Sequence, residues 1–350
     1  MQDVAAYGTV SATDDLKSMT ISRRSPEATD VDIEVLYCGV CHSDLHSARN
    51  DWGYSRYPLV PGHEIIGRVV RVGTEVSRYS AGDLVAVGCL VDSCRSCSSC
   101  EEDLEQYCDG GLVGTYGSND QRHGGAMTYG GYSERIVVEQ RFVLKVPENL
   151  DAKAAAPLLC AGITTWSPLR HWKIGKGDTV GIIGLGGLGH MGVKFAHALG
   201  AKVVMITSSP SKAEDARRLG ADSVLISGDA EAMKNADSSF DFLLNTIPVE
   251  HDINPYISLL KRDGTMVIVG ALVPLHDALQ AGPLVMKRRR IAGSIIGGLK
   301  ETQEMLDFCG EHNIVSEIEM IDMQTINQAY ERMLKNDVKY RFVIDMATLS

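Results

Sequence analysis

The chain has 350 residues, enough for two domains that each bury a core of their own. Its 44% apolar and 23% charged residues are typical of a soluble globular protein, and no apolar run reaches the roughly 18 residues that cross a membrane. The net charge of −11 disfavours nucleic acid as a general partner. The basic run Lys287-Arg288-Arg289-Arg290 is the one local exception, and we expect it to be a solvated face.

The cysteine count and the N-terminus bear on the compartment. Nine cysteines are present, and the sequence begins without the basic-then-apolar pattern of a signal peptide. An odd number of thiols without an export signal favours a reducing cytoplasm, and metal ligation over disulfides. Six cysteines receive ligand roles below, and Cys38, Cys89 and Cys309 are expected to be small buried residues.

The first half of the chain predicts short strands joined by long loops. The alternation in residues 31–36 predicts a half-buried strand. It is followed by Cys41-His42-Ser43-Asp44, where a thiol, an imidazole, a hydroxyl and a carboxylate are crowded together. The Pro/Gly-punctuated loop of residues 58–64 then presents His63 and Glu64. This half shows no regular alternation of strands and helices.

Four cysteines lie within fifteen positions: Cys94, Cys97, Cys100 and Cys108. The loop between them is small and polar, so it lacks the apolar residues that would hold it together. Four thiolates at this spacing are typical of a structural zinc, whose binding free energy would serve as folding free energy. A closed four-thiolate site leaves no position for a substrate. The alternatives are disulfides, or thiols with no shared role.

The second half, from about residue 150, alternates strands and helices. Residues 152–159 are compatible with a helix and end at Cys160. Strands are predicted over 179–184, 203–206, 223–226, 240–245, 265–270 and 291–295, with helices over 189–199 and 211–219. This alternation predicts a parallel, doubly wound sheet. Helices over 300–309 and 325–335 and a strand over 341–345 close the chain and are expected to rejoin the first domain.

A glycine-rich turn follows the first strand of this sheet. Gly184, Gly186 and Gly189 satisfy the G-x-G-x-x-G spacing between a predicted strand and a predicted helix. The first glycine permits a tight turn, the second allows a pyrophosphate to approach the backbone, and the third allows the helix to pack closely. The sequence therefore predicts a dinucleotide site; the alternative is a glycine-rich turn without a ligand.

The end of the second strand discriminates between the two dinucleotides. NAD sites normally place Asp or Glu here, which binds the ribose hydroxyls and repels an added phosphate. This chain instead reads Thr207-Ser208-Ser209-Pro210-Ser211-Lys212. Hydroxyls and an ammonium group suit a 2′-phosphate, so the sequence favours NADP(H). The alternative is a solvated turn without discriminating power.

Cys41, His63 and Cys160 remain as possible ligands of a second metal. Two thiolates and one imidazole with an open fourth position describe a catalytic zinc. The long sequence separation makes this hypothesis weak on spacing alone, because a lone cysteine or histidine is more often a packing residue.

Five motifs occur in this order: Cys41-His42-Ser43-Asp44, Gly62-His63-Glu64, the cysteine knuckle (residues 94–108), Cys160-Ala161-Gly162 and residues 184–189. Together they resemble the zinc-dependent medium-chain alcohol dehydrogenase family over essentially the whole chain. Residues 184–192 and 207–212 are similar to its cinnamyl alcohol dehydrogenase branch, which includes bacterial NADPH-dependent aldehyde reductases. The resemblance implies a GroES-like β-rich catalytic domain (1–155 and 297–350) with two zinc sites. It also implies a Rossmann NADP(H)-binding domain (156–296) and a homodimer.

Residue roles follow from the resemblance. Cys41, His63 and Cys160 would hold the catalytic zinc, with Glu64 behind it as an exchangeable ligand. Asp44 would orient the ligating histidine, and Ser43 and His46 would relay the substrate proton. The implied cofactor contacts are His42, Thr164, Gly184, Gly186, Gly187, Leu188, Gly189, Thr207, Ser208, Ser209, Lys212 and Arg341, and the implied walls of the substrate pocket are Trp52 and Tyr116.

The implied activity is hydride transfer between NADP(H) and aromatic or medium-chain alcohols and aldehydes. Zinc would polarise the aldehyde oxygen, and we expect reduction to be the physiological direction. Plant lignin enzymes of this branch carry bulky aromatics just past the last knuckle cysteine, where this chain has Leu112-Val113-Gly114-Thr115-Tyr116. Tyr116 could take their place, but a permissive pocket is expected. The rival hypotheses are a conjugate or iminium reductase on the same scaffold, a non-catalytic NADPH-binding protein, and a zinc-free quinone reductase. The first rival is disfavoured by Ser43 and His46, because it needs no proton relay. The second is disfavoured by the presence of Cys41, His63 and Cys160, and the third by both sets of metal ligands.

Overall fold

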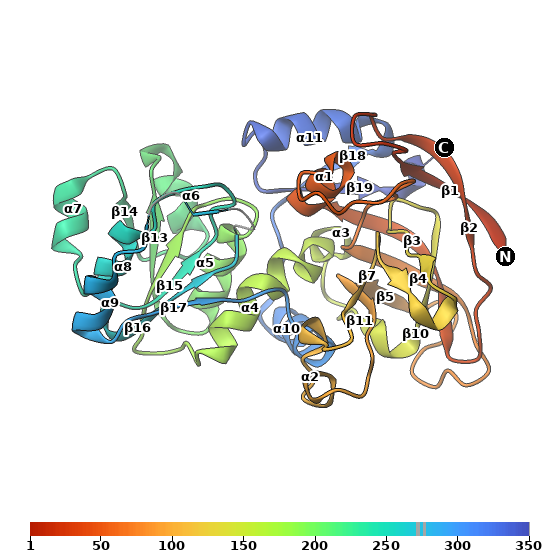
Figure 1. Cartoon of the computed structure of the whole chain (residues 1–350), viewed down its shortest axis with the longest axis horizontal. Coiled ribbons are helices and arrows are strands. Elements are labelled where there is room, and N and C mark those ends of the chain that lie inside the picture. The colour runs from red at the N-terminus through yellow and green to blue at the C-terminus, as the bar shows by residue number, and fades with distance from the viewer. Residues whose placement is uncertain (271–273, 276–277, 350) are drawn as a thin grey trace. The chain divides into compact units, whose positions relative to one another are not determined.

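The computed structural model describes residues 1–270, 274, 275 and 278–349 (Figure 1). The chain forms two compact units: unit 1 is Met1–Ile163 with Gly297–Ser350, and unit 2 is Thr164–Ile296. The sequence places the first boundary at 155/156, and the structure places it at 163/164. The reason is that the 3-10 helix η4 (Ala156–Leu159) packs against β3, β4, β5 and β19 of unit 1.

Unit 1 is built around a seven-stranded sheet with the order β11-β5-β4-β3-β19-β18, in which β10 also pairs with β3. Its strands are β1 (Gln2–Gly8), β2 (Lys17–Arg23), β3 (Asp30–Val40), β4 (Ile65–Val72), β5 (Leu84–Val87), β6 (Leu90–Asp92), β7 (Val113–Gly114), β8 (Asn119–Asp120), β9 (Ala126–Met127), β10 (Arg135–Glu139), β11 (Leu144–Lys145), β18 (Ile318–Asp322) and β19 (Arg341–Asp345). Its α-helices are α1 (His42–Arg49), α2 (Ser98–Glu101), α3 (Ala152–Ala155), α10 (Leu299–His312) and α11 (Ile326–Leu334).

The strand β3 is the centre of this sheet. It pairs antiparallel with β4, β10 and β19, and most of its residues are buried, including Asp32, which pairs with Arg71 and Arg135. The chain leaves β3 at Val40 and enters α1 directly, a helix that the local sequence pattern does not predict. It returns to the sheet at Ile65 at the start of β4, opposite Cys38. The residues on either side of these two strand ends are thereby brought together.

Unit 2 contains the predicted parallel sheet, with the order β14-β13-β12-β15-β16-β17 and every pairing parallel. Its strands are β12 (Thr179–Ile183), β13 (Lys202–Thr207), β14 (Ser223–Ile226), β15 (Phe240–Asn245), β16 (Leu260–Ile268) and β17 (Arg290–Gly293). Its helices are α5 (Gly189–Ala198), α6 (Ala213–Arg218), α7 (Ala230–Asn235), α8 (Asn254–Leu259) and α9 (Ala281–Lys287), while α4 (Ala161–His171) begins in unit 1.

The strand order of unit 2 is that of the Rossmann fold. Starting from β12, the next strands β13 and β14 are added on one side of it, and β15, β16 and β17 are added on the other side. The strand order therefore reverses between β12 and β15. Figure 1 shows α5 and α6 on one side of the strands and α8 and α9 on the other. Ligands of such sheets bind beyond the carboxyl ends of the strands at the reversal point. The predicted glycine-rich turn lies there.

Two local predictions need correction. The helix predicted over 152–159 is divided into α3 and η4, with Pro157 in the first turn of η4, because proline lacks the N–H that a continuous α-helix requires. The basic run at 287–290 is only partly solvated. The Arg289 side chain is 4% exposed and donates to the carbonyl oxygens of Ser258 and Leu260 at the end of α8.

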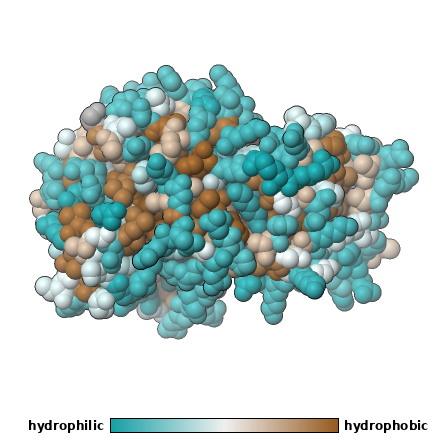
Figure 2. All heavy atoms as spheres, turned by 180° about the vertical axis from the view of Figure 1, so that it is seen from behind, coloured by the Kyte–Doolittle hydropathy of each residue, from teal (hydrophilic) through white to brown (hydrophobic). Residues whose placement is uncertain are grey.

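The face in Figure 2 is largely hydrophilic, with hydrophobic patches between the polar side chains. Among the described residues, none of the helices has the length and apolar character needed to cross a bilayer.

Gly39 of β3 lies in close contact with Glu64, the residue just before β4. A Cβ atom at Gly39 would lie 1.9 Å from Glu64 Oε2 and 3.0 Å from Glu64 Cβ. We expect Gly39→Ala to lower the free energy of unfolding by about 1–3 kcal/mol, because the buried carboxylate must move. Urea denaturation measures this. The control is Gly228→Ala, where a Cβ atom meets nothing within 4 Å. Equal stability of the two variants would contradict the clash.

Candidate functional site

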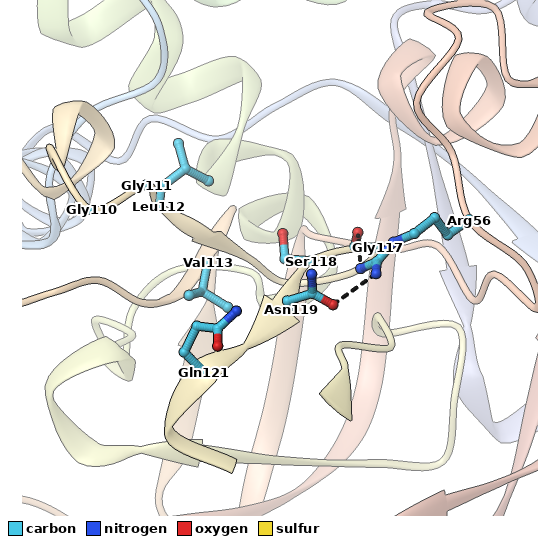
Figure 3. A pocket seen from close by; sticks show the side chains of 9 residues that line it. All are labelled: Arg56, Gly110, Gly111, Leu112, Val113, Gly117, Ser118, Asn119 and Gln121. Atoms are coloured by element: carbon cyan, nitrogen blue, oxygen red, sulfur yellow. Dashed lines mark hydrogen bonds between the residues drawn. The ribbon is translucent and has the colours of Figure 1, made fainter. Parts of the chain in front are cut away.

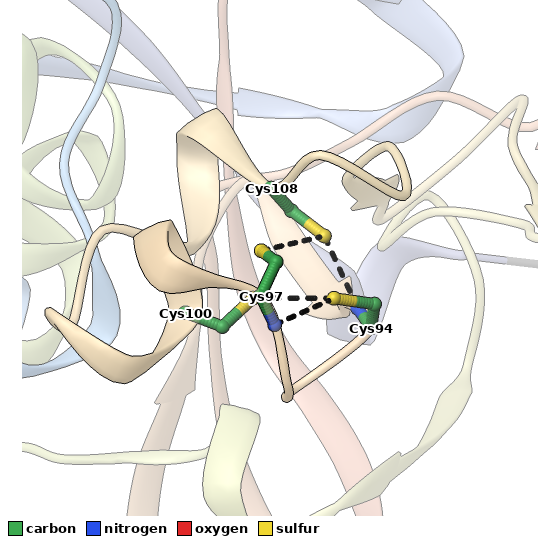
Figure 4. A group of neighbouring side chains, drawn as sticks. All are labelled: Cys94, Cys97, Cys100 and Cys108. Atoms are coloured by element: carbon green, nitrogen blue, oxygen red, sulfur yellow. Dashed lines mark hydrogen bonds between the residues drawn. The ribbon is translucent and has the colours of Figure 1, made fainter.

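The four cysteines of the knuckle converge, as Figure 4 shows. Cys94 Sγ lies 3.9 Å from Cys100 Sγ, and Cys97 Sγ lies 4.0 Å from Cys108 Sγ. A tetrahedron of sulfurs about 2.3 Å from a zinc ion has edges of about 3.8 Å. A disulfide instead requires about 2.05 Å, and all nine cysteines of the chain are free thiols. The donor set therefore fits a four-thiolate zinc.

Backbone N–H groups of the knuckle point at the sulfurs. Cys94 N donates to Cys108 Sγ at 3.2 Å, Cys97 N to Cys94 Sγ at 3.3 Å, and Asp109 N to Cys97 Sγ at 3.4 Å. Such bonds favour the thiolate; backbone N–H groups, with that of Ser96 the largest contributor, lower the pKa of Cys94 to about 6. Burial instead raises the pKa of Cys108 to about 12, so the bonds favour the thiolate at Cys94 and not at every sulfur of the knuckle.

A second cluster lies elsewhere in unit 1. One donor atom each from Cys41, His63, Glu64 and Cys160 lies within 4.8 Å of the other three. The two sulfurs are 3.8 Å apart, again the edge expected around zinc. Their hydrogen bond lowers the pKa of Cys41 and raises that of Cys160, so Cys41 is the first to lose its proton. The fold thus brings together four residues from three distant parts of the sequence.

Each donor of this cluster lies at the end of a regular element. Cys41 is the N-cap of α1, His63 and Glu64 precede β4, and Cys160 is the C-cap of η4. The packed sheet therefore fixes the donors although none lies inside a strand.

Asp44 lies in the first turn of α1 and is fully buried. Its Oδ1 accepts from Gly62 N and from His63 Nδ1, both at 3.0 Å, and its Oδ2 accepts from Cys41 N at 2.9 Å. Although burial opposes it, the Asp44 carboxylate raises the pKa of His63. A neutral ring that donates from Nδ1 to Asp44 would keep its lone pair on Nε2, which is the tautomer that binds metal. The structure thus places Asp44 against His63, and its role in orienting a metal ligand stays a prediction.

Glu64 is fully buried, and burial raises its pKa to about 7. One oxygen, Oε1, accepts from Arg341; the other, Oε2, has no hydrogen-bond partner within the described part of the chain. A buried carboxylate oxygen without a partner is unfavourable unless a cation or a water binds it. Glu64 also offers one carboxylate oxygen to the two thiols and the imidazole, so its incomplete set of partners supports the fit of a metal ion.

Arg341 has partners in unit 1 that the sequence does not indicate. It lies in β19, is 5% exposed, and donates to Glu64 Oε1 and, at 2.8 Å, to the Val40 carbonyl. The structure therefore makes Arg341 the partner of Glu64. The pairing spans 277 positions, so no local pattern could have indicated it. Its contact with a cofactor phosphate stays a prediction.

The proposed relay residues lie on α1. Ser43 Oγ is 3.7 Å from Cys41 Sγ, so it borders the cluster. His46 lies one turn further along and pairs through Nδ1 with Asp51 Oδ2 at 2.7 Å. Its ring centroid is 5.4 Å from that of Trp52. His42 is half-buried, and burial lowers its pKa.

The two predicted pocket residues, Tyr116 and Trp52, have different neighbours. The Tyr116 ring centroid lies 5.7 Å from that of His63, and its hydroxyl is 3.3 Å from Ser47 Oγ. Trp52 is half-buried and stacks on Tyr54 at 5.8 Å. Tyr116 is therefore beside the metal cluster, whereas Trp52 is beside His46.

The sequence prediction missed Cys89. It was expected to be a small buried residue, but it is only partly buried, and its thiol interacts with that of Cys160 and lies 3.5 Å from the Leu159 carbonyl. A third thiol therefore borders the cluster. Cys89 is far in sequence from both Cys41 and Cys160, so no local pattern indicated that its thiol lies beside the cluster.

A cavity of about 440 Å³ lies near the knuckle (Figure 3). Its lining residues are Arg56, Gly110, Gly111, Leu112, Val113, Gly117, Ser118, Asn119 and Gln121. Arg56 donates to Asn119 Oδ1 at 2.7 Å across its edge. None of the four residues of the second cluster lines this cavity, so it is not the metal site.

A third group of possible ligands consists of Glu27, Asp30 and His123. Asp30 is already paired with both terminal nitrogens of Arg24, and His123 pairs with Asp120. The cationic guanidinium occupies the place beside Asp30 that a metal would require. These residues are therefore an ion-pair network.

The glycine-rich turn of unit 2 has the expected geometry. Gly184 has a φ of +91°, which favours glycine. A Cβ atom at Gly189 would lie 1.9 Å from the Gly184 carbonyl oxygen, whereas one at Gly186 would meet nothing within 4 Å. The turn continues through Gly187 and Leu188 into the N-terminus of α5. Its backbone is therefore open to a ligand at Gly186 and tightly packed at Gly189.

The end of β13 lies beside this turn. Thr207 is buried and its Oγ1 accepts from Ser209 N, and Ser208 separates them. Lys212 Nζ donates to the Leu185 carbonyl at 2.9 Å, so the ammonium is held against the turn. Thr164 is the first residue of unit 2 and is 6% exposed.

Comparisons with known proteins agree with this arrangement. The model of the alcohol dehydrogenase GroES-like domain matches residues 27–148, and that of the zinc-binding dehydrogenases matches residues 187–311. Aldehyde reductase YahK of Escherichia coli is 56% identical over 99% of both chains. NADP-dependent alcohol dehydrogenase C 1 of Mycolicibacterium smegmatis is 51% identical over 100% of this chain and 99% of its own.

Solved structures give the same result. A cinnamyl alcohol dehydrogenase of Sorghum bicolor superimposes with a TM-score of 0.96 at 46% identity, covering 100% of this chain and 99% of its own. The Helicobacter pylori enzyme CAD, complexed with NADP(H), gives 0.93 at 39% identity and 99% of both chains. The chain therefore belongs to the zinc-dependent medium-chain alcohol dehydrogenase family, in its cinnamyl alcohol dehydrogenase-like branch.

Proposed function

We propose that the chain is a zinc-dependent, NADP(H)-dependent alcohol dehydrogenase, acting as an aldehyde reductase on aromatic or medium-chain substrates. The observation that carries the proposal is the buried cluster of Cys41, His63, Cys160 and Glu64, with its 3.8 Å sulfur pair and its unpartnered carboxylate oxygen. The family and the relatives named as aldehyde reductase and NADP-dependent alcohol dehydrogenase support it.

Two metal ions per chain follow from the two donor sets. The knuckle would hold a structural zinc, because four thiolates fill its coordination. Cys41, His63 and Cys160 would hold the catalytic zinc, with Glu64 as an exchangeable fourth ligand. When bound, this zinc would act as a Lewis acid that polarises the substrate oxygen and favours negative charge on it.

The residues of the chain supply the rest of the chemistry. Asp44 holds His63 in its metal-binding tautomer through the bond to Nδ1. Ser43 Oγ, beside Cys41, would exchange the proton of the substrate hydroxyl. His46, paired with Asp51 and 28% exposed, would pass that proton to solvent. This relay would carry the substrate proton to solvent without admitting water to the buried side of the site.

The preference for NADP(H) rests on the end of β13. Residues 207–212 carry no carboxylate, and the Lys212 ammonium lies against the glycine-rich turn. A 2′-phosphate would meet hydroxyls and a cation there, with no repulsion from Asp or Glu. Because cellular NADPH is generally kept reduced, we propose aldehyde reduction as the physiological direction.

A homodimer through unit 2 is part of the proposal. Strand β17 is an edge of the six-stranded sheet, and an unpaired strand edge is a template for another chain. On the preceding helix α9, Val285 is 76% exposed and Met286 is 82% exposed. Large apolar side chains beside a strand edge favour contact with a second copy. The expected compartment is the cytoplasm.

The first test combines an aldehyde panel with a zinc count. We expect NADPH-dependent reduction of aromatic and medium-chain aldehydes by a protein with two zinc ions per chain. Cys160→Ser should lose one zinc and at least about 100-fold in kcat, because a ligand of the reactive metal is removed. Cys100→Ser should lose the other zinc and unfold at lower temperature. Elemental analysis and steady-state kinetics measure these changes.

The matched control is Cys309→Ser, a buried thiol of α10 outside both clusters. This variant should keep two zinc ions and wild-type kcat. A single zinc or none in active wild-type protein, or full turnover by Cys160→Ser, would overturn the proposal.

The second test addresses the cofactor. Thr207→Asp places a carboxylate at the end of β13, where it would repel a 2′-phosphate and accept from ribose hydroxyls. We expect the ratio of kcat/KM for NADPH over NADH to fall by at least about tenfold, equivalent to about 1.4 kcal/mol. The isosteric control Thr207→Asn carries no charge and should retain the preference for NADPH. An unchanged ratio in Thr207→Asp would show that this position does not discriminate.

A further inference from the structure

Arg23, at the end of β2, binds backbone carbonyls and a hydroxyl group instead of a carboxylate. Its Nη1 donates to the Tyr129 carbonyl at 2.7 Å, and its Nη2 donates to the Gly130 carbonyl at 2.8 Å and to Ser133 Oγ at 2.7 Å. The neighbouring arginines 24, 71 and 135 pair with Asp30 or Asp32. Within the described chain, Arg23 forms no ion pair with a carboxylate; its guanidinium binds one loop.

This loop (residues 129–133, the clamp loop) lies against the segment that precedes His63. Gly130 N donates to the Val60 carbonyl at 2.8 Å, Gly131 N to the Gly62 carbonyl at 2.8 Å, and Tyr132 N to the Pro61 carbonyl at 3.0 Å. Arg23 therefore holds the carbonyl side of the clamp loop while the N–H groups of the loop hold residues 60–62.

The contact between the two segments is too close for other residues. A Cβ atom at Gly130 would lie 2.2 Å from the Pro61 carbonyl oxygen, and one at Gly62 would lie 2.7 Å from the Tyr132 ring. Gly62 also has a φ of +102°. A shift of the clamp loop would thus be transmitted to Gly62, the residue bonded to His63.

The clamp loop also reaches Asp44. The Tyr132 hydroxyl is 3.5 Å from Asp44 Oδ2, while Asp44 Oδ1 accepts from Gly62 N and His63 Nδ1. Both supports of the imidazole, its backbone and its carboxylate partner, therefore contact the loop that Arg23 binds.

We propose that Arg23 is a positioning residue for His63: its guanidinium fixes the clamp loop, and the clamp loop fixes the orientation of the imidazole through Gly62 and Asp44. Arg23 itself touches neither the donor cluster nor, in the proposed reaction, the reacting atoms. The inference rests on the proposed function, because His63 is taken as a ligand of the catalytic metal.

The test uses Arg23→Met and Arg23→Lys in the full chain, with cobalt(II) substituted at the catalytic site. The visible absorption of cobalt reports ligand geometry, and the rate of metal loss to a chelator reports how firmly the ligands are held. Arg23→Met should shift the absorption band, speed metal loss by about 10–100-fold and lower kcat by a similar factor, as is common for residues supporting a ligand. KM for NADPH should stay unchanged. Arg23→Lys should recover only part of the loss, because an ammonium lacks the fork of two nitrogens.

Arg71→Met is the matched control. Arg71, in β4, pairs with Asp32 of β3, is 52% exposed and has no bond to the clamp loop among the described contacts. The Arg71→Met variant should at most have a lower thermal stability, and its cobalt spectrum and its rate of metal loss should match those of the wild type. Should Arg23→Met fail to fold, Ser133→Ala removes one acceptor of Arg23 and should shift the same readouts in the same direction.

The outcomes separate the two proposals. Wild-type protein that binds no metal at Cys41, His63 and Cys160 would overturn the proposed function and, with it, the role of Arg23. Wild-type protein that binds metal there, together with folded Arg23 and Ser133 variants whose cobalt spectra and metal-loss rates match wild type, would overturn the positioning role alone.

Discussion

The second cluster depends on one buried carboxylate, that of Asp44. An isolated buried anion is strongly unfavourable, so its charge must be met by hydrogen-bond donors. Here the donors are the N–H groups of Cys41 and Gly62 and the ring nitrogen of His63. A single side chain thereby joins the start of α1 to the segment before β4. Two of the donor residues are held in register by the same anion that selects the tautomer of the imidazole.

The two thiol clusters show two ways to bring metal-binding side chains together. The knuckle is local: its sulfurs come from fifteen consecutive residues, and its own backbone N–H groups point at them. Its geometry therefore needs little from the rest of the fold. The cluster of Cys41, His63, Glu64 and Cys160 is assembled from the ends of α1, η4 and the segment before β4. It exists only when the sheet of unit 1 is complete, which ties its chemistry to the packing of β3.

This difference explains what the sequence could predict. The knuckle and the glycine-rich turn are encoded by spacing, so their residues were predictable, as was the parallel sheet, whose helices and strands alternate in sequence. The surroundings of Cys89 and Arg289 and the pairing of Arg341 with Glu64 were not predictable, because the partners lie far away in the chain and no local pattern records such pairings. The helix α1 was missed because Cys41-His42-Ser43-Asp44 was interpreted for its chemistry. The capping bond from Cys41 N to Asp44 that begins the helix also builds the site.

The charge balance around Glu64 gives the strongest physical reason to place a dication in this cluster. With both thiols ionised, Cys41, Cys160, Asp44 and Glu64 would bring four negative charges into a buried region where Arg341 is the cation that pairs with Glu64. Burial then drives Glu64 towards its neutral form, which is the direction of its raised pKa. A divalent ion bound by the sulfurs would remove most of this excess and would give the Glu64 carboxylate a second cationic partner. A carboxylate that Arg341 already binds could then pair with either cation, as the predicted role of Glu64 as an exchangeable ligand requires.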